Sequence, residues 1–364
     1  MKILQVIPQL SSGGAERFTV DLCNELTELG HDVTLCVIRK LSDVSFYMSD
    51  LSDKVKVISL NKGQGFSIKS LIQMTKLIFK LKPDIIHTHV RAITYTVLAE
   101  LFVKGGVHTV HNTASKEATD KLSVVVRKIL FKLKRVLPVT ISLDSQLSFT
   151  DFYGFDAPLV YNGRNVSSDL AVSDSVKKEI ESYKKNNSTV VFIHLARFQS
   201  QKRHLVMCHA ANKLYKEGYN FSLLFIGAHS DRAIYEAVRN DMSENCYILG
   251  ERKNPLEYLK YAGTLVLSSS YEGLPISLIE ALGVGAIPIC TPVGGIPNLI
   301  QSGYNGILSS DISEESYYLA LKSYLEMTDS EKSLMSQNAV NSYHPYSMKK
   351  CAVNYVKLYE SIKK

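Results

Sequence analysis

The feature that most constrains the fold is the alternation of short apolar runs with helical patterns in both halves of the chain. The apolar runs of the first half are KILQVIP, DVTLCVI, DIIHTH, GVHTVHN and LPVTIS, and those of the second half are TVVFIHLAR, FSLLFIGA, CYILG, GTLVLSSS and AIPICTP. Strands separated by helices of this length form parallel sheets from βαβ units. We therefore predict an α/β protein with two doubly wound domains, which bind ligand in a cleft beyond the carboxyl ends of the strands.

The length and composition agree with two globular domains. The chain has 364 residues, of which 45% are hydrophobic and 21% are charged, so each half can bury a core of its own. Turn-forming residues cluster in VYNGRNVSSDLAVSDS, which favours a domain boundary there. The predicted domains are 1–163 and 164–345. The pattern alone leaves open which of them holds the last helix, 346–364.

Charge and cysteine usage exclude several classes of protein. The net charge of +7 favours binding of phosphate-bearing small molecules or anionic lipid. Nucleic acid is a weaker candidate, because the sequence contains no zinc module and no basic-aromatic strand pattern. The six cysteines lack metal-type spacing, which favours buried thiols in a reducing compartment. No apolar stretch approaches the roughly 20 residues of a membrane span. We expect a cytoplasmic protein without a leader peptide.

Glycines and histidines follow three strands of the first half. Gly13 and Gly14 join the first strand to the first helix, where free backbone N–H groups can bind an anion; a plain turn explains them equally well. His89 ends one strand, and His111 with Asn112 ends the next. An HxH pair on a strand can ligate zinc, but no further ligand stands at suitable spacing, so we expect no metal. These histidines are either structural or directed into the cleft.

A basic loop follows the first strand of the second half. Arg197 and Lys202 lie in LARFQSQKRH. Arginine can bind a diphosphate by two parallel hydrogen bonds, and lysine can bind it as a point charge. The alternative is a solvated basic loop.

Two carboxylates flank a helix start in EGLPISLIE. Pro275 suits the first helical position, and Gly273 and Leu274 can present N–H groups to phosphate oxygens. Glu280 falls within an otherwise apolar helix, where an ionised carboxylate needs hydrogen-bond donors. Ribose hydroxyls could supply them; so could a core lysine or backbone N–H groups. Glu272 precedes the helix.

Taken together, these motifs resemble the retaining glycosyltransferases of family 4, which have the GT-B fold of two Rossmann-like domains facing a central cleft. The resemblance covers the whole chain and runs in order through GGAER, HTH, HN, YNG, RFQSQKRH, EGLPISLIE and TPVGGIPNLI. It implies an acceptor-binding first domain, a nucleotide-sugar-binding second domain, and a C-terminal helix that crosses back to the first. The sequence departs from the family pattern at Ala196, Asn298 and NGRN.

The resemblance also implies roles for the residues of the second half. It implies that Glu272 contacts the donor sugar and that Glu280 binds the ribose. It further implies that Arg197 and Lys202 hold the diphosphate without a metal or other cofactor. Gly273 and Leu274 complete the implied donor site.

In the first half, the resemblance implies that the loop with Gly13 and Gly14 closes over the donor phosphates. It places His111 near the reacting sugar. His89 and Asn112 are then the candidates for acceptor binding.

The implied function is transfer of a sugar from a nucleoside diphosphate, with UDP favoured, to a glycan or lipid-linked saccharide in bacterial surface polysaccharide synthesis, such as capsule or lipopolysaccharide. A nucleotide-sugar 2-epimerase of the same fold is an alternative; a non-catalytic donor-binding partner subunit is another. Acceptor-dependent release of UDP would distinguish the transferase.

One further segment, 119–137, has the pattern of a basic amphipathic helix. Apolar residues recur there at helical spacing, and Lys121, Lys128, Lys132 and Arg135 are predicted on the opposite face, flanked by Arg127 and Lys134. We expect this helix to lie on an anionic membrane surface. The alternative is a helix packed on the core with a solvated basic face.

Overall fold

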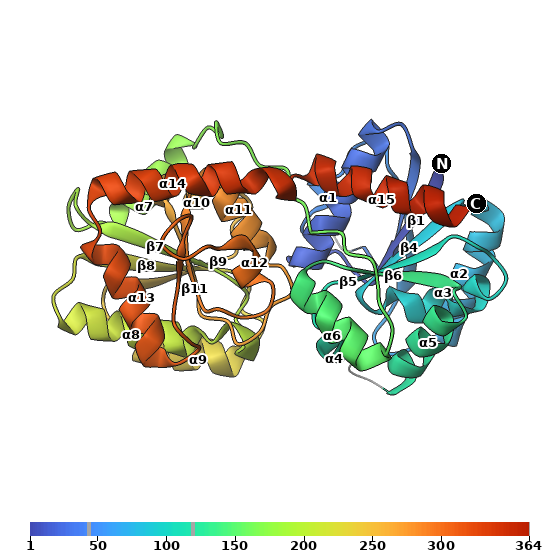
Figure 1. Cartoon of the computed structure of the whole chain (residues 1–364), viewed down its shortest axis with the longest axis horizontal. Helices are drawn as coiled ribbons and strands as arrows, with labels where there is room; N and C mark the ends of the chain where they lie inside the picture. Colours follow the sequence, from blue (N-terminus) through green and yellow to red (C-terminus); the bar gives the residue numbers. More distant parts are fainter. Residues whose placement is uncertain (42–44, 118–120, 364) are drawn as a thin grey trace. The chain divides into compact units, whose positions relative to one another are not determined.

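The chain folds into two compact units (Figure 1). A computed structural model describes residues 1–41, 45–117 and 121–363, with the backbone alone at 116, 121 and 122. Unit 1 comprises Met1–Asn165 and Tyr346–Lys364, and unit 2 comprises Val166–Pro345. The described parts of both units contain parallel strands joined by helices, which confirms the predicted class.

In the described part of unit 1, six parallel strands form one sheet in the order β3-β2-β1-β4-β5-β6. The order reverses between β1 and β4, which is where ligands bind in doubly wound sheets. The strands are β1 (Lys2–Ile7), β2 (Asp32–Arg39), β3 (Lys56–Lys62), β4 (Ile85–His89), β5 (Gly106–Val110) and β6 (Val136–Thr140).

Helices cover both faces of this sheet. Because side chains alternate along a strand, Leu4 and Val6 of β1 pack beneath the helices of one face, whereas Gln5 contacts Tyr359 on the other. The helices and 3-10 turns of unit 1 are α1 (Gly14–Glu28), η1 (Met48–Asp50), α2 (Ile68–Leu81), η2 (Val90–Ala92), α3 (Ile93–Glu100), α4 (Ala114–Glu117), α5 (Lys121–Lys132), α6 (Leu143–Tyr153) and α15 (Met348–Lys363). The last helix of the chain thus lies in unit 1, beside α1.

Unit 2 has its strands in two sets, β9-β8-β7 and β10-β11-β12. Side chains link the two sets where β7 meets β10: Thr264 Oγ1 donates to the Val191 carbonyl at 2.6 Å, and His194 Nδ1 lies 2.7 Å from the Val266 carbonyl. The strands are β7 (Val190–Leu195), β8 (Phe221–Ile226), β9 (Cys246–Gly250), β10 (Thr264–Leu267), β11 (Ile287–Cys290) and β12 (Ile307–Leu308).

The helices of unit 2 pack against both sets of strands around a large core of aromatic and aliphatic side chains. No described helix of either unit has the length and apolar character needed to cross a membrane. The helices and turns are α7 (Asp174–Ser182), η3 (Ser200–Lys202), α8 (His204–Lys216), α9 (Arg232–Asp241), α10 (Pro255–Ala262), α11 (Ile276–Val284), α12 (Ile296–Leu299), α13 (Glu314–Glu326) and α14 (Asp329–Tyr343), with η4 (His344–Tyr346) joining α14 to α15.

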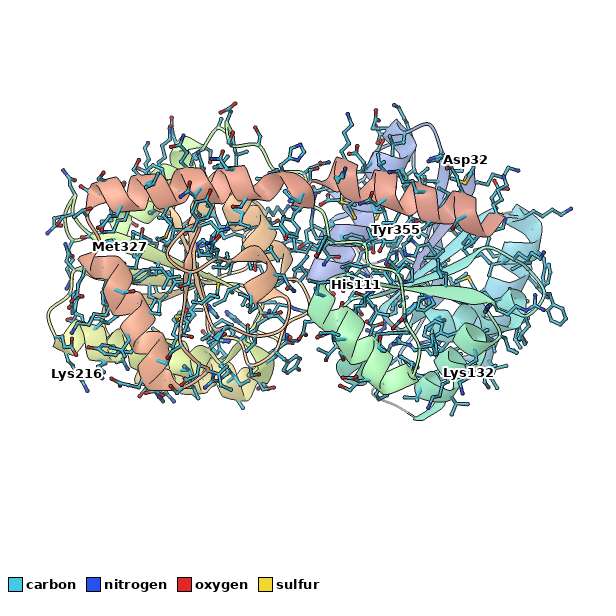
Figure 2. All side chains as sticks on the ribbon, viewed as in Figure 1. Asp32, His111, Lys132, Lys216, Met327 and Tyr355 are labelled. Carbon is cyan, nitrogen blue, oxygen red and sulfur yellow. The ribbon has the colours of Figure 1, made fainter. Side chains whose placement is uncertain are left out.

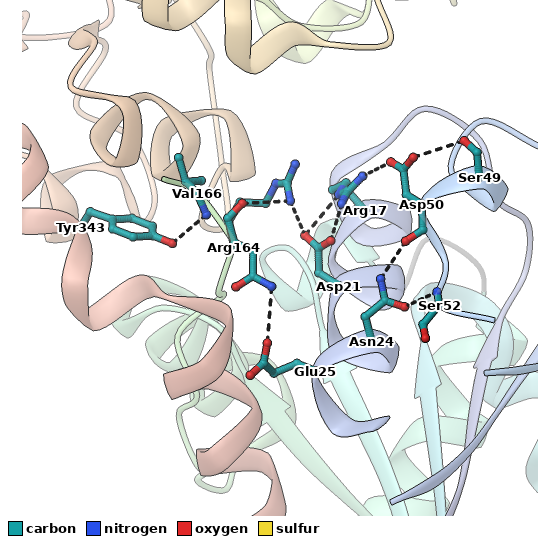
Figure 3. A network of polar contacts seen from close by, with 11 residues as sticks. Arg17, Asp21, Asn24, Glu25, Ser49, Asp50, Ser52, Arg164, Val166 and Tyr343 are labelled. Carbon is teal, nitrogen blue, oxygen red and sulfur yellow. Dashed lines mark hydrogen bonds and ion pairs between the residues drawn. The ribbon is translucent and has the colours of Figure 1, made fainter. Parts of the chain in front are cut away.

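The connection out of unit 1 is anchored by an ion pair (Figure 3). Arg164 Nη1 lies 2.8 Å from Asp21 Oδ2 of α1, and both side chains are almost fully buried. Asp21 is held in turn by Arg17, which also pairs with Asp50. This pair keeps residues up to Asn165 in unit 1, whereas the sequence prediction placed the division after residue 163.

Helix α5 differs from its prediction. It ends at Lys132, because Val136 already begins β6, and residues 119 and 120 and the side chains of Lys121 and Leu122 lie outside the described part. Arg127, predicted beside the basic face, is 1% exposed. The reason is a buried carboxylate, Glu117, whose Oε1 lies 3.1 Å from Arg127 Nη2.

Candidate active site

The loop that follows β7 meets the loop that follows β10. Lys202, at the end of η3, places its Nζ 2.5 Å from Glu272 Oε1. Ser269 Oγ donates to the same carboxylate oxygen at 2.5 Å, and Gln201 Nε2 lies 3.3 Å from the other oxygen. Two residues predicted from separate motifs, Lys202 and Glu272, are therefore in direct contact.

Hydrogen bonds fix these two loops against each other. The Ser270 N–H donates to the Gln201 carbonyl at 2.8 Å, and Gln201 Nε2 donates to the Tyr271 carbonyl at 2.8 Å. Ser268 Oγ donates to the Lys202 carbonyl at 3.0 Å. Lys202 and Glu272 thus stand on a braced scaffold, which is what a preorganised charge site requires.

Glu272 is held from behind by the glycine loop after β11. Gly294 has φ +54°, and a Cβ built on it would lie 1.8 Å from the Glu272 carbonyl oxygen. The Gly295 N–H donates to the Gly273 carbonyl at 2.8 Å. Only glycine allows the backbone to approach this closely with a left-handed conformation.

Arg197 lies on the same loop as Lys202, two residues beyond β7, and is half-buried. No residue in the described part of the chain forms a hydrogen bond or ion pair with its guanidinium. An arginine whose donors are not used within the protein can bind an external anion by two parallel hydrogen bonds. The structure shows no contact between Arg197 and Glu272.

Glu280 is buried within α11, at 5% exposure. Gly273 and Leu274 form the turn before this helix, and Leu274 is buried as well. The helix begins at Ile276, so Pro275 is its N-cap residue and not its first helical residue. The prediction of a carboxylate in an apolar helix is thus confirmed, while its role remains a prediction.

A polar hollow of about 350 Å³ adjoins the Lys202–Glu272 pair. Hydrogen-bonding side chains from the loops after β7, β8 and β10 dominate its lining. These residues are Gln199, Ser200, Gln201, Ser230, Asp231 and Tyr271.

Unit 1 contributes a hydrogen-bonded histidine chain at the ends of β4 and β5. His89 Nε2 lies 2.8 Å from Gln5 Oε1, and His89 Nδ1 lies 3.0 Å from His111 Nε2 (Figure 2 labels His111). Because the Gln5 oxygen only accepts, the network assigns the proton to His89 Nε2. His111 then donates from Nε2, so its Nδ1 is the ring nitrogen that can accept a hydrogen bond.

Both histidines are neutral near pH 7. Burial lowers the pKa of His111 to about 4, and burial with the neighbouring His87 and His111 lowers the pKa of His89 well below its ordinary value. The ring of Phe18 from α1 packs edge-on against both. A neutral imidazole of this kind can accept a proton or a hydrogen bond.

Glu117 is the buried residue of this region whose role sequence reasoning missed. Its Oε2 accepts the His111 backbone N–H at 2.6 Å, and its Oε1 lies 3.1 Å from both His108 Nε2 and Arg127 Nη2. Burial alone would raise the pKa of Glu117, but Arg127 and His108 outweigh it and lower the pKa to about 2. No local pattern marks Glu117, since its partners come from β5 and α5.

The glycine loop and the side chain of Asn112 make local contacts of their own. Helix α1 begins at Gly14 with Gly13 as its N-cap, and the Glu16 carboxylate, which accepts from Ser11 Oγ at 2.7 Å, covers Gly13. Asn112 Oδ1 accepts the Thr113 N–H at 2.8 Å and shapes the turn. In the described part of the chain, the side chain of Asn112 and the loop of Gly13 and Gly14 form no hydrogen bond with the ring of His89 or His111.

Two family models match the chain. The model described as Glycosyltransferase Family 4 matches residues 12–197, and that described as Glycosyl transferases group 1 matches residues 175–341.

Curated relatives resemble the chain over most of its length. The UDP-Gal:alpha-D-GlcNAc-diphosphoundecaprenol alpha-1,3-galactosyltransferase of Escherichia coli is 24% identical over 93% of this chain and 90% of its own. The capsular polysaccharide biosynthesis glycosyltransferase CapH of Staphylococcus aureus is 23% identical over 77% and 78%. Among solved structures, Anabaena HepE in complex with UDP-glucose superposes with a TM-score of 0.84 over 99% of this chain and 100% of that chain, at 16% identity. The likeness shows the same GT-B fold.

Proposed function

Because this chain belongs to glycosyltransferase family 4 and is a glycosyltransferase, we propose that it moves a sugar from a UDP-sugar to a saccharide carried on a lipid. The activities for which the Escherichia coli and Staphylococcus aureus relatives are named support a role in bacterial surface polysaccharide synthesis. The UDP-glucose bound to the Anabaena protein supports UDP as the donor nucleotide. The transfer retains the anomeric configuration and takes place at the cytoplasmic face of the membrane.

The observation that carries this proposal is the Lys202–Glu272 contact on two braced loops at the carboxyl ends of β7 and β10. A diphosphate leaving group needs fixed positive charge where its own charge grows. Lys202 and Arg197 supply that charge. Glu272, already bound to Lys202, is placed to accept hydroxyls of the donor sugar.

The remaining donor contacts come from α11. Gly273 and Leu274 precede the N-terminus of α11, whose positive dipole end favours phosphate oxygens. Glu280 is the proposed acceptor for the ribose hydroxyls.

In unit 1, His111 Nδ1 accepts a hydrogen bond from a reacting hydroxyl, while His89 fixes the tautomer. Asn112 borders the acceptor, whereas His89, which is fully buried with both ring nitrogens hydrogen-bonded, acts only through His111. Gly13 and Gly14 form the candidate phosphate-binding loop of unit 1. The departing phosphate takes the acceptor proton on the same face of the sugar, since no side chain is assigned as a nucleophile.

A screen of nucleotide sugars by thermal stabilisation tests the donor. A ligand that binds only the folded chain raises its melting temperature, so a UDP-sugar should stabilise the protein more than the matching GDP-sugar. Release of UDP should then require a lipid-linked saccharide. Conversion of the sugar without an acceptor would instead indicate the 2-epimerase.

The proposed site uses no metal. Transfer should therefore survive EDTA, because Arg197 and Lys202 replace the cation. Activity that EDTA abolishes and Mg²⁺ or Mn²⁺ restores would contradict this part of the proposal.

A further inference from the structure

Large apolar side chains are exposed together on three helices of unit 1. Monomeric proteins rarely expose extended apolar patches, and those that do use them for binding. The exposed residues are Phe66, Ile68, Ile72 and Phe79 on or before α2, Leu98 and Phe102 on or after α3, and Val125, Ile129 and Leu133 on or after α5. Phe102 is the most exposed of them, at 76%.

The three helices form one layer. α3 contacts both α2 and α5 (Figure 1). Their inner faces pack into two core clusters: Met74 and Ile78 of α2 join α3 in one, and Leu130 and Phe131 of α5 join α3 in the other. The outer faces of α2, α3 and α5, here called the α2–α3–α5 surface, therefore point away from the sheet.

Lysines lie beside the apolar residues on the outer helices of this layer. In α2, Lys76 and Lys80 are exposed and lie one turn apart, and Lys69 is exposed as well. In α5, Lys128 and Lys132 are exposed in the same relation (Figure 2 labels Lys132).

The described helices of this surface expose no acidic side chain. The sequences of α2, α3 and α5 contain one carboxylate, Glu100, and it is fully buried. The wider charge distribution is similar: of the chain's 42 basic residues 26 fall in unit 1 and 16 in unit 2, whereas its 35 acidic residues divide as 16 and 19. The positive charge of the protein is thus a property of unit 1.

We propose that the α2–α3–α5 surface docks on an anionic lipid bilayer, with Phe102 and the apolar residues of α2 and α5 entering the interface and the lysines facing the headgroups. This deepens the proposed function, which places the acceptor on a lipid. The sequence predicted membrane contact through one helix, the segment 119–137. The proposed surface is instead a layer of three helices, in which α2 carries as many lysines as α5.

The chemistry of the surface selects this partner. A basic and apolar face is the combination that binds an anionic interface, because the lysines are attracted by the surface potential and the apolar groups leave water. The attraction falls off within a Debye length, so salt should weaken it.

Vesicle binding of the full chain tests the electrostatic part. The protein should sediment with vesicles of equal parts phosphatidylglycerol and phosphatidylcholine at low salt, and not with phosphatidylcholine alone. Lys76→Glu with Lys80→Glu should weaken this binding at least about tenfold. The matched control is Lys349→Glu with Lys350→Glu on α15, which makes the same change of charge on the other face of the sheet and should leave binding within about twofold.

The apolar part can be tested with a single introduced tryptophan, excited selectively over tyrosine, because the chain contains no tryptophan of its own. Phe102→Trp should emit at shorter wavelength when these vesicles are added, since its ring enters the interface. Leu334→Trp, on exposed α14 of unit 2, should not change.

Three results would overturn the proposal: equal binding by both charge reversals, an unshifted Phe102→Trp spectrum on bound vesicles, or a shift that appears without lipid as protein concentration rises. The last result would assign the surface to a second copy of the chain. Donor-dependent thermal stabilisation needs no lipid, so it tests the proposed function separately.

Discussion

Lys202 and Arg197 are the two cations proposed for the diphosphate, but only Lys202 has a carboxylate partner in the described part of the chain. Replacing either with alanine should lower kcat/KM by about 10² or more, as loss of a preorganised charge does. Arg197→Ala should leave the melting temperature nearly unchanged. Steady-state assays with both variants check the first expectation, and near-normal turnover in both would remove the diphosphate assignment.

The Lys202–Glu272 contact changes the expected effect of Lys202→Ala on stability. From the sequence alone, Arg197 and Lys202 are ligand-facing loop residues that contribute little to the stability of the fold, and we keep that expectation for Arg197. Lys202→Ala, however, leaves the buried Glu272 carboxylate without its cation, which costs about 1–3 kcal/mol. We therefore expect its melting temperature to fall by a few degrees, measured beside Arg197→Ala.

Glu100 is a buried carboxyl group without a hydrogen-bond donor in the described part of the chain. Burial raises its pKa to about 8. Between its ordinary value and that pKa the folded chain holds a proton that the unfolded chain has lost, so stability falls as pH rises through this range. Glu100→Gln, which cannot ionise, should be more stable than the parent at about pH 8 and gain little at about pH 5. Thermal unfolding at both pH values measures this; an equal gain at both would contradict it.

At the scale of elements, the glycine loop after β11 is the clearest constraint. Gly294→Ala places a methyl group against the Glu272 carbonyl and forces the loop away from the donor site, so activity and stability should both collapse. Gly303→Ala is the matched control, because Gly303 has a similar positive φ with open space around it. It should cost only about 1 kcal/mol. Comparable losses of activity and stability in the two variants would contradict this, because they would assign the effect of Gly294→Ala to its positive φ and not to the close approach of Glu272.

Helix α5 shows what a periodic pattern can and cannot predict. Helical spacing correctly identified a helix with basic residues, but it ranked Arg127 with the exposed lysines. A helical pattern records hydrophobicity along one segment, whereas the position of Arg127 depends on Glu117 and on the Val90 carbonyl, which its Nη2 contacts at 2.8 Å. With Arg127 facing the core, Val125 and Ile129 are left on the outside.

The strand-end residues were more predictable. Gly13, His89, His111, Arg197 and Glu272 each follow an apolar run, and parallel strands bring such positions to one edge of their sheet. That rule places Lys202 near Glu272 without any knowledge of their contact. The same rule does not predict the hydrogen bonds of Gln201 to the loop after β10, because a glutamine in a loop belongs to no periodic pattern or motif.

At the scale of the whole molecule, buried histidines make the protein sensitive to acid. His87, His89 and His108 in unit 1 and His194 and His204 in unit 2 are buried, His111 is partly buried, and desolvation lowers the pKa of each. The unfolded chain therefore binds more protons below the ordinary histidine pKa, and stability falls as pH falls through that range. Melting curves from about pH 7 to pH 4.5, in the Glu100→Gln background to remove its opposite trend, should show this decline. Constant stability over that range would count against neutral buried histidines.

Unit 1 is built from two separated stretches of sequence, and this has a consequence for synthesis. The Tyr359 hydroxyl, which lies 2.7 Å from His87 Nδ1, and the Tyr355 hydroxyl, 2.7 Å from Thr109 Oγ1, reach the sheet only from α15. On the ribosome, residues 1–165 emerge before this helix exists, with His87 and Thr109 still lacking these partners. Residues 166–345, by contrast, are complete before α15 has been translated. Unit 2 begins to emerge after unit 1 but can finish folding before it, because unit 1 is complete only once α15 has emerged.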